Sequence, residues 1–308
     1  MKQQIDQRNA QYVPAFTLAP DQRAVEVHAP PAVQAPNFIN DVAAGKVELP
    51  TIPQIVQSLL AALRDPSVDA RRIGHALSQD PVLSAKVLRL ANSSFFGGQR
   101  SMASIDAAIA LIGTEALNRL IVACGVASSF AEIPGIDLRT FWRDALVAAT
   151  AAHKLAPRLG ADPEEAYVCG LLHATGHLIL CQTYPEIATL VFDGFAVLRG
   201  AELAATENDS FGIDHPSVGA LWTETIGFPQ PVADAIRKAV LPAADADLPL
   251  DAALRGACVL AAAVAQKSAV DTAWTALPAA VQARFGAAGP DAAFAKLYEA
   301  LQGIEPTF

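Results

Sequence analysis

The feature that most constrains the fold of this chain is its apolar pattern, which follows a helical period almost without interruption from Phe38 onward. After Pro53, for example, Ile55, Leu59 and Leu63 share one face of a helix. No alternating run of β-branched residues is long enough to predict a strand. The sequence therefore predicts an all-α protein.

Cap residues divide this pattern into short helices. Asp80 and Pro81 supply an N-cap and a first helical residue for 81–91, Ser104 can cap 105–112, and Gly113 can end that helix. Thr114 is expected to cap the next helix, over 115–130. Each boundary has a local physical cause, so these helices should form where the caps lie.

Two longer helices are predicted in the second part of the chain. The stretch FWRDALVAATAAHKLAPRL covers 141–159, and EEAYVCGLLHATGHLILCQTY covers 164–184. Trp142 in the first of these, and Trp222 further on, have apolar neighbours, which predicts that both indoles pack in the core.

Composition shifts divide the chain into four parts. Residues 1–37 are rich in proline and lack periodicity, which predicts an extended or poorly ordered arm. A helical half over 38–131 is separated by EIPGID from a second half over 138–240. An acidic linker punctuated by prolines leads to a C-terminal helical extension over 241–308.

Charge and cysteine usage narrow the setting. With 22 Lys and Arg against 31 Asp and Glu, the formal net charge of −9 does not favour nucleic acid or an anionic membrane as a partner. The N-terminus has no apolar stretch typical of a secretion signal, and no later run is long enough to span a bilayer. Four scattered cysteines indicate reduced thiols. The predicted location is the cytoplasm.

Several motifs occur in an order that resembles the HDOD (HD-related output domain) family. They are LPTIPQIV, SQDPVLSAKVLRLANSSFFGGQRSMASIDAAIALIG and FGIDHPSVGALWTETIGFPQPVADAI, and the likeness covers 38–240. The resemblance implies a bacterial signalling module. Its fold would be a helical bundle like that of the HD metal-dependent phosphohydrolases, preceded by a smaller helical subdomain. It also implies action by binding rather than by hydrolysis.

The residues that would hold metal in an HD phosphohydrolase are mostly replaced in this chain. The resemblance places Asp144 where the first histidine is expected, and the His-Asp pair becomes His173-Ala174. The later aspartate falls near Ala262, which has no donor atom, whereas His215 remains. A catalytic metal needs several converging imidazoles and carboxylates. The remnant positions Asp144, His173 and His215 therefore predict no bound metal, no cofactor and no catalytic residue.

The helix predicted for 164–184 offers a separate candidate metal site. Cys169, His173 and His177 are spaced so that all three would lie on one helix face. On a straight helix the first and third would lie about 12 Å apart, which is too far to share one ion. A buried, hydrogen-bonded face is the preferred interpretation.

Without a catalytic centre, the chain would act through a surface, and the loop after Asn92 offers suitable anchors. Gly97 and Gly98 give this loop backbone freedom. Helix termination by the polar residues and core packing by the phenylalanines are the alternative interpretations. The candidate partner-binding residues are Asn92, Ser93, Ser94, Phe95, Phe96 and Arg100.

The sequence thus favours a non-catalytic signalling regulator or adaptor that binds protein, or a nucleotide. The resemblance implies signalling proteins of cyclic-dinucleotide pathways as partners. The runner-up is a phosphohydrolase or phosphodiesterase with a rearranged metal site. A third hypothesis is a DNA-binding helix-turn-helix over 71–90, with Lys86 and Arg89 on its second helix. Few side chains on that helix suit base recognition, so nucleic acid is not the expected partner.

Overall fold

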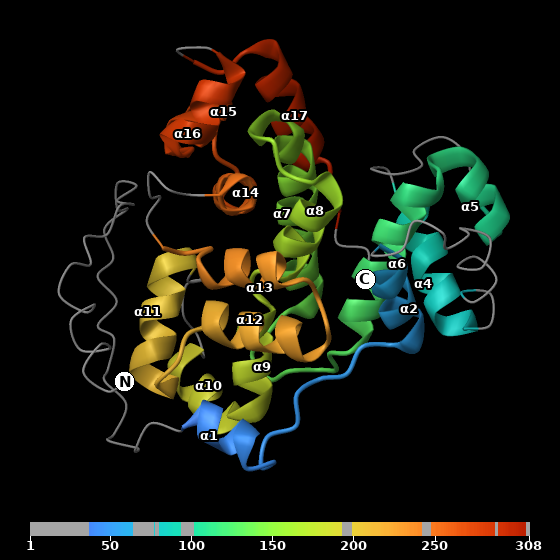
Figure 1. The fold of residues 1–308 in the computed structure, drawn as a ribbon. Coiled ribbons are helices and arrows are strands. Elements are labelled where there is room, and N and C mark those ends of the chain that lie inside the picture. Colours follow the sequence, from blue (N-terminus) through green and yellow to red (C-terminus); the bar gives the residue numbers. More distant parts are fainter. Residues whose placement is uncertain are drawn as a thin grey trace. The chain divides into compact units, whose positions relative to one another are not determined.

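The computed structural model describes residues 37–63, 77, 80–93, 102–192, 199–241, 248–286 and 289–305, and for 59–63 it describes the backbone alone. These ranges contain helices and no strand, which confirms the all-α prediction (Figure 1). No described helix is both long and apolar enough to cross a membrane. The helices are α1 (Phe38–Ala43), α2 (Gln54–Leu63), α4 (Pro81–Ala91), α5 (Ile105–Ile112), α6 (Thr114–Ser128), α7 (Leu138–Leu159), α8 (Pro163–Leu172), α9 (Thr175–Thr183), α10 (Pro185–Phe192), α11 (Gly200–Phe211), α12 (His215–Thr225), α13 (Gln230–Arg237), α14 (Pro249–Ala265), α15 (Val270–Ala276), α16 (Ala279–Gln282) and α17 (Ala292–Gln302), with a 3-10 turn η1 (Ala283–Phe285) after α16.

The caps confirm most of the predicted helix starts. The Asp80 carboxylate accepts a hydrogen bond from the Leu83 backbone N–H at 2.9 Å, and the Ser104 hydroxyl accepts one from Ala107 at 3.1 Å. The predicted cap at Thr114 is wrong. Gly113, with φ of +81°, ends α5 and is also the N-cap of α6, so Thr114 is already the first helical residue. A glycine shared by two helices leaves no position between them for a capping side chain.

The long helix predicted for 141–159 is confirmed as part of α7, whereas the one predicted for 164–184 is wrong. That stretch forms α8 and α9, which are separated at His173 and Ala174. Two close backbone contacts favour the break. A Cβ at Gly170 would lie 2.6 Å from the Ala148 carbonyl oxygen of α7, and one at Gly176 would overlap the His215 carbonyl of α12. The two glycines thus fit their helices against different partners, and the chain turns between them.

The main core lies between long helices of the second half. Helix α7 packs against α8 and α14, and α12 packs against α9 and α13 (Figure 1). Trp142 and Trp222 are almost fully buried, which confirms their predicted core role. The Phe130 ring lies next to both, with centroid distances of 5.8 and 5.6 Å. Aromatic burial of this kind contributes strongly to core stability.

The C-terminal region, predicted as an extension beyond Val240, shares this core through α14. Arg255 on α14 donates hydrogen bonds to the carbonyl oxygens of Lys238 and Leu241, both at 2.8 Å. Lys238 in turn forms an ion pair with Asp251 of α14 at 2.9 Å. Together with the packing of α14 on α7, these contacts make 249–265 a structural part of the second half.

Candidate functional site

His173 lies at the break between α8 and α9, where its imidazole is fixed by the backbone. Nδ1 is 2.7 Å from the Gly170 carbonyl oxygen. A carbonyl can only accept, so Nδ1 carries the hydrogen and Nε2 is directed elsewhere. Burial lowers the pKa of this imidazole, but contacts with the Cys258 thiol and the Gly170 carbonyl outweigh it, so the pKa of His173 is raised. His173 is thus a side chain fixed by the Gly170 carbonyl and the Cys258 thiol.

A second group of side chains, which we term the Glu207 cluster, consists of Glu207, His177 and His215. The fully buried Glu207 carboxylate lies 2.7 Å from His177 Nδ1 and 2.6 Å from His215 Nδ1. It also accepts a hydrogen bond from the His215 backbone N–H at 2.7 Å. The three residues come from α9, α11 and α12, so one carboxylate joins three helices.

The electrostatics of the Glu207 cluster favour a charged pair. Burial alone would raise the pKa of Glu207, yet the two neighbouring imidazoles hold it below its usual value. Burial would likewise lower the pKa of His177, but hydrogen bonds to Cys181 and Glu207 raise it. Because each shift favours the ionised form, the cluster carries a buried carboxylate with an imidazolium beside it.

The carboxylate of Asp144, the third remnant position, forms ion pairs with two arginines. Its carboxylate lies 2.7 Å from Arg199 and 3.3 Å from Arg143, and its side chain is 13% exposed. Arg199 immediately precedes α11, so this ion pair ties α7 to the start of α11. Two guanidinium groups compensate the carboxylate, which makes it a poor ligand for a cation.

These donors do not fit an HD-type metal centre. Among the described residues, no group of three or more His, Cys, Asp or Glu side chains is arranged to hold a metal ion. His173 and His215 are each held through Nδ1 by an oxygen acceptor, an orientation usual in metal ligands, but the His173 imidazole also contacts the Cys258 thiol. However, Ala174 has no donor atom, and Asp144 pairs with arginine.

The predicted stripe of Cys169, His173 and His177 does not form a common site. The stripe required one straight helix, and the chain turns between α8 and α9. Cys169 is fully buried, and its thiol donates to the Val232 carbonyl at 3.9 Å. His177 instead contacts Glu207. The three side chains therefore serve packing and hydrogen bonding, as the preferred interpretation had it.

Only the start of the predicted partner loop lies within the described residues. The Asn92 side chain, at the end of α4, donates to the Met102 carbonyl at 2.8 Å and accepts from the Met102 N–H at 2.6 Å. These two bonds link Asn92 directly to Met102. Ser93 is half-buried beside Asn92. Ser94, Phe95, Phe96 and Arg100 lie outside the described residues, so the partner surface stays a prediction.

The sequence reasoning missed Glu207 and Arg199. A signal for Glu207 was present, because Leu203, Ala204 and Phe211 place it on the buried face of α11. A glutamate on such a face requires a buried partner, and the histidines supply it. Arg199 carries no comparable local signal, since only the fold brings it to Asp144.

With this geometry established, comparison with known proteins identifies the class. A family model of the HDOD domain matches residues 49–242. The chain therefore belongs to the HDOD family, as its motifs predicted.

The individual relatives share only a low sequence identity with this chain. A curated protein of Treponema pallidum (strain Nichols), named only as uncharacterized, is 25% identical over 192 residues, which are 62% of this chain and 37% of that protein. The chain thus spans little more than a third of its length.

Two solved structures share the fold. A protein of Shewanella amazonensis SB2B, provisionally named a phosphohydrolase, is 29% identical with a TM-score of 0.67, covering 89% of this chain and 98% of that one. An HDOD domain protein of unknown function from Geobacter sulfurreducens is 23% identical with a TM-score of 0.64, covering 85% and 95%.

Proposed function

We propose that this protein is a non-catalytic component of bacterial signal transduction, acting in the cytoplasm by binding a partner protein through its HDOD domain. The observation that carries the proposal is the state of the remnant site. Asp144 is paired with Arg199, Ala174 stands where a ligand is expected, and Glu207 is bound by two imidazoles. A hydrolase of the HD type needs converging, uncompensated ligands.

A metal-dependent phosphohydrolase is the second candidate, and one observation favours it. The Nδ1 atom of His215 is held by the Glu207 carboxylate, which leaves its Nε2 for another contact, and the His173 imidazole is likewise fixed through Nδ1. The provisional name of the Shewanella amazonensis protein points in the same direction. The non-catalytic adaptor is preferred because two imidazoles alone do not complete a catalytic centre.

DNA binding is not proposed as the function. Lys86, one of the two cations on the predicted recognition helix, donates a hydrogen bond to the Ser128 hydroxyl at 3.0 Å. On the same helix, α4, the side chains of Leu83, Val87 and Leu90 are buried. These contacts support a role for α4 in packing rather than in a DNA groove.

Hydrolysis and metal content separate the first two candidates. The full chain, purified without chelators, is expected to contain substoichiometric Mn, Fe and Zn. With added Mn²⁺ or Fe²⁺ it should not hydrolyse bis(p-nitrophenyl) phosphate or cyclic dinucleotides faster than a His173→Ala/His215→Ala variant. Metal-dependent turnover that this double variant abolishes, without a change in its melting temperature, would establish the phosphohydrolase instead.

Partner binding tests the adaptor role directly. Arg100→Ala is expected to weaken binding to the partner by about 1 kcal/mol or more, because arginines often anchor interfaces. Arg284→Ala, at an exposed arginine of η1, serves as the matched control. His173→Ala should leave partner binding intact. Partners captured by the wild-type chain and measured by titration provide the assay. Equal affinities for wild type and Arg100→Ala would contradict the predicted surface.

A further inference from the structure

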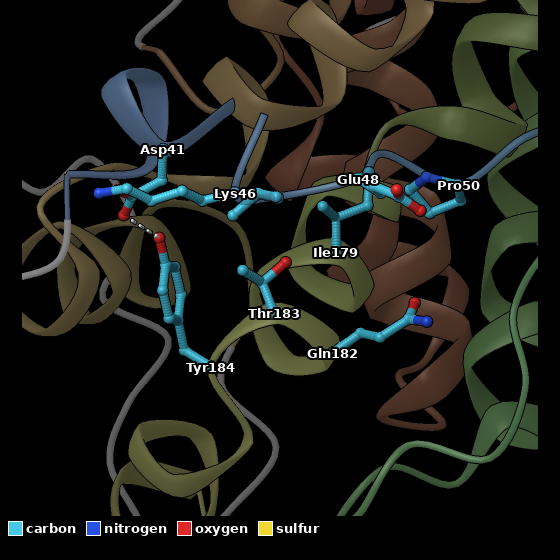
Figure 2. A pocket seen from close by; sticks show the side chains of 9 residues that line it. Asp41, Lys46, Glu48, Pro50, Ile179, Gln182, Thr183 and Tyr184 are labelled. Carbon is cyan, nitrogen blue, oxygen red and sulfur yellow. Dashed lines mark hydrogen bonds and ion pairs between the residues drawn. The ribbon is translucent and has the colours of Figure 1, made fainter. Parts of the chain in front are cut away.

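A pocket lies apart from the remnant site, between the segment after α1 and the last turn of α9. Its volume is about 590 Å³ (Figure 2). One wall is built from the stretch that includes Lys46 and Glu48, and the other includes Gln182, Thr183 and Tyr184. No residue of this pocket belongs to the predicted site or to the Glu207 cluster.

The wall that includes Lys46 and Glu48 is fixed at both ends. At one end, the Tyr184 hydroxyl donates to the Asp41 carboxylate at 3.3 Å. At the other, the indole N–H of the buried Trp222 donates to the Pro50 carbonyl at 2.7 Å. Because the segment is held at both ends by side chains of the second half, the pocket is a preformed feature rather than a gap beside a free strand of chain.

The charges that line the pocket favour a cationic occupant. Its single cation, Lys46, already forms an ion pair with Asp41 at 3.3 Å. Figure 2 shows Lys46 beside Asp41 toward one end, with Glu48 and Gln182 toward the other. Glu48 is exposed and has no hydrogen-bond or ion-pair partner among the described residues. The C-terminal end of α9 adds partial negative charge, which attracts cations and repels anions.

The polar groups in the pocket also set the shape of a suitable ligand. The Glu48 carboxylate, the Thr183 hydroxyl and the Gln182 side-chain carbonyl are acceptors that lie on two opposing walls. A guanidinium group has five N–H donors in a planar fork and can bind a carboxylate through two of them while reaching other acceptors. A phosphate or carboxylate ligand would instead face Glu48 and the end of α9.

We infer that this pocket binds an arginine side chain presented by a basic segment of a partner protein. The inference rests on the proposed function, since it names the chemistry of a partner. It adds a second contact surface that is independent of the predicted loop around Arg100. Glu48 would hold the guanidinium, and Thr183 and Gln182 would orient it.

Fluorescence anisotropy with the full chain tests this inference. The probe is a fluorescein-labelled peptide of alternating arginine and glycine, with lysine and glutamate peptides of the same length for comparison. Glu48→Lys is expected to raise the dissociation constant of the arginine peptide by about tenfold or more, as for loss of a close charge pair. Glu299→Lys, which reverses an exposed carboxylate on α17, should change it by less than about twofold.

Three results would overturn the inference. They are no binding of the arginine peptide to the wild type, an equal loss of binding in Glu48→Lys and Glu299→Lys, and tighter binding of the glutamate peptide. Melting temperatures of both variants establish that they are folded. A failure here is distinguishable from failure of the adaptor proposal, which is decided by hydrolysis, metal content and the Arg100→Ala variant.

Discussion

The protein neutralises the negative charges of two carboxylates, Glu207 and Asp144, in different ways. Glu207 is fully buried and bound by two imidazoles and a backbone N–H. Asp144 retains some exposure and is paired with Arg199 and Arg143, whose side chains are also partly exposed. Both arrangements neutralise a negative charge, but only the first does so without water.

This difference determines how much each carboxylate matters for stability. A buried charge that loses its partners keeps the full cost of its desolvation, whereas an exposed one recovers hydration from the solvent. Helices α9, α11 and α12 should therefore depend on Glu207 far more than α7 and α11 depend on the arginines around Asp144. The following predictions test that ranking.

The largest effect is expected for Glu207→Ala. This variant removes the acceptor for His177 and His215 and leaves two imidazoles and the His215 N–H without it. We expect a loss of about 3–5 kcal/mol in the free energy of unfolding, as for a broken buried ion pair. Urea denaturation followed by circular dichroism measures it. Glu202→Ala, on the same helix, is the control, and similar losses in both variants would contradict a special role for Glu207.

The next effect is a dependence of stability on pH that arises from His177 and Glu207. The pKa of His177 is raised from 6.5 to about 10, so its stabilising contribution is complete below pH 6.5 and is lost as the pH rises toward 10. The pKa of Glu207 is lowered from 4.5 to about 2, so its contribution is complete above pH 4.5 and is lost as the pH falls toward 2. The stability that the pair contributes should be greatest between pH 4.5 and pH 6.5.

The variant His177→Gln isolates this contribution, because glutamine can still donate to Glu207 but does not titrate. Between pH 6.5 and 10, we expect the wild type to lose on the order of 2 kcal/mol more than the variant. Thermal melting of both chains across this pH range provides the comparison. Parallel curves would show that the imidazole of His177 is not protonated in the folded protein.

The smallest effect is expected for Arg199→Ala. It removes the shorter of the two Asp144 contacts, at 2.7 Å, but leaves Arg143 and solvent to compensate the carboxylate. We expect a loss of about 1 kcal/mol or less in the free energy of unfolding. The same denaturation experiment applies, with Lys154→Ala, an exposed position of α7, as the control. A loss as large as that of Glu207→Ala would contradict the comparison.

Much of the fold follows from local sequence signals. The caps at Asp80 and Ser104 form as their residue types predict, because a short polar side chain can reach free N–H groups of its own helix. Trp142 and Trp222 are buried as their apolar surroundings predict. The HDOD motifs also lie within one stretch of chain, so the family could be recognised before the structure was known.

The candidate site was less accessible to this reasoning. The sequence identified His173, His215 and Asp144 as remnants, but not the groups that their side chains contact in the folded protein. The pairing of Asp144 with Arg199 joins residues far apart in the chain, and no spacing rule predicts it. Likewise, the pocket at Glu48 depends on the anchoring of its wall by Tyr184 and Trp222.

The sequence by itself thus determined the helical class, most of the helix ends, the buried indoles and the family, because each depends on short-range periodicity, caps or motifs. Only the tertiary structure decided where 164–184 turns, because the close approach of Gly170 to α7 and of Gly176 to α12 involves distant segments. The same holds for the Glu207 cluster. Its charges are stabilised because three helices bring the carboxylate and both imidazoles within hydrogen-bond distance, which offsets the cost of burying them. That convergence is a property of packing rather than of any local sequence.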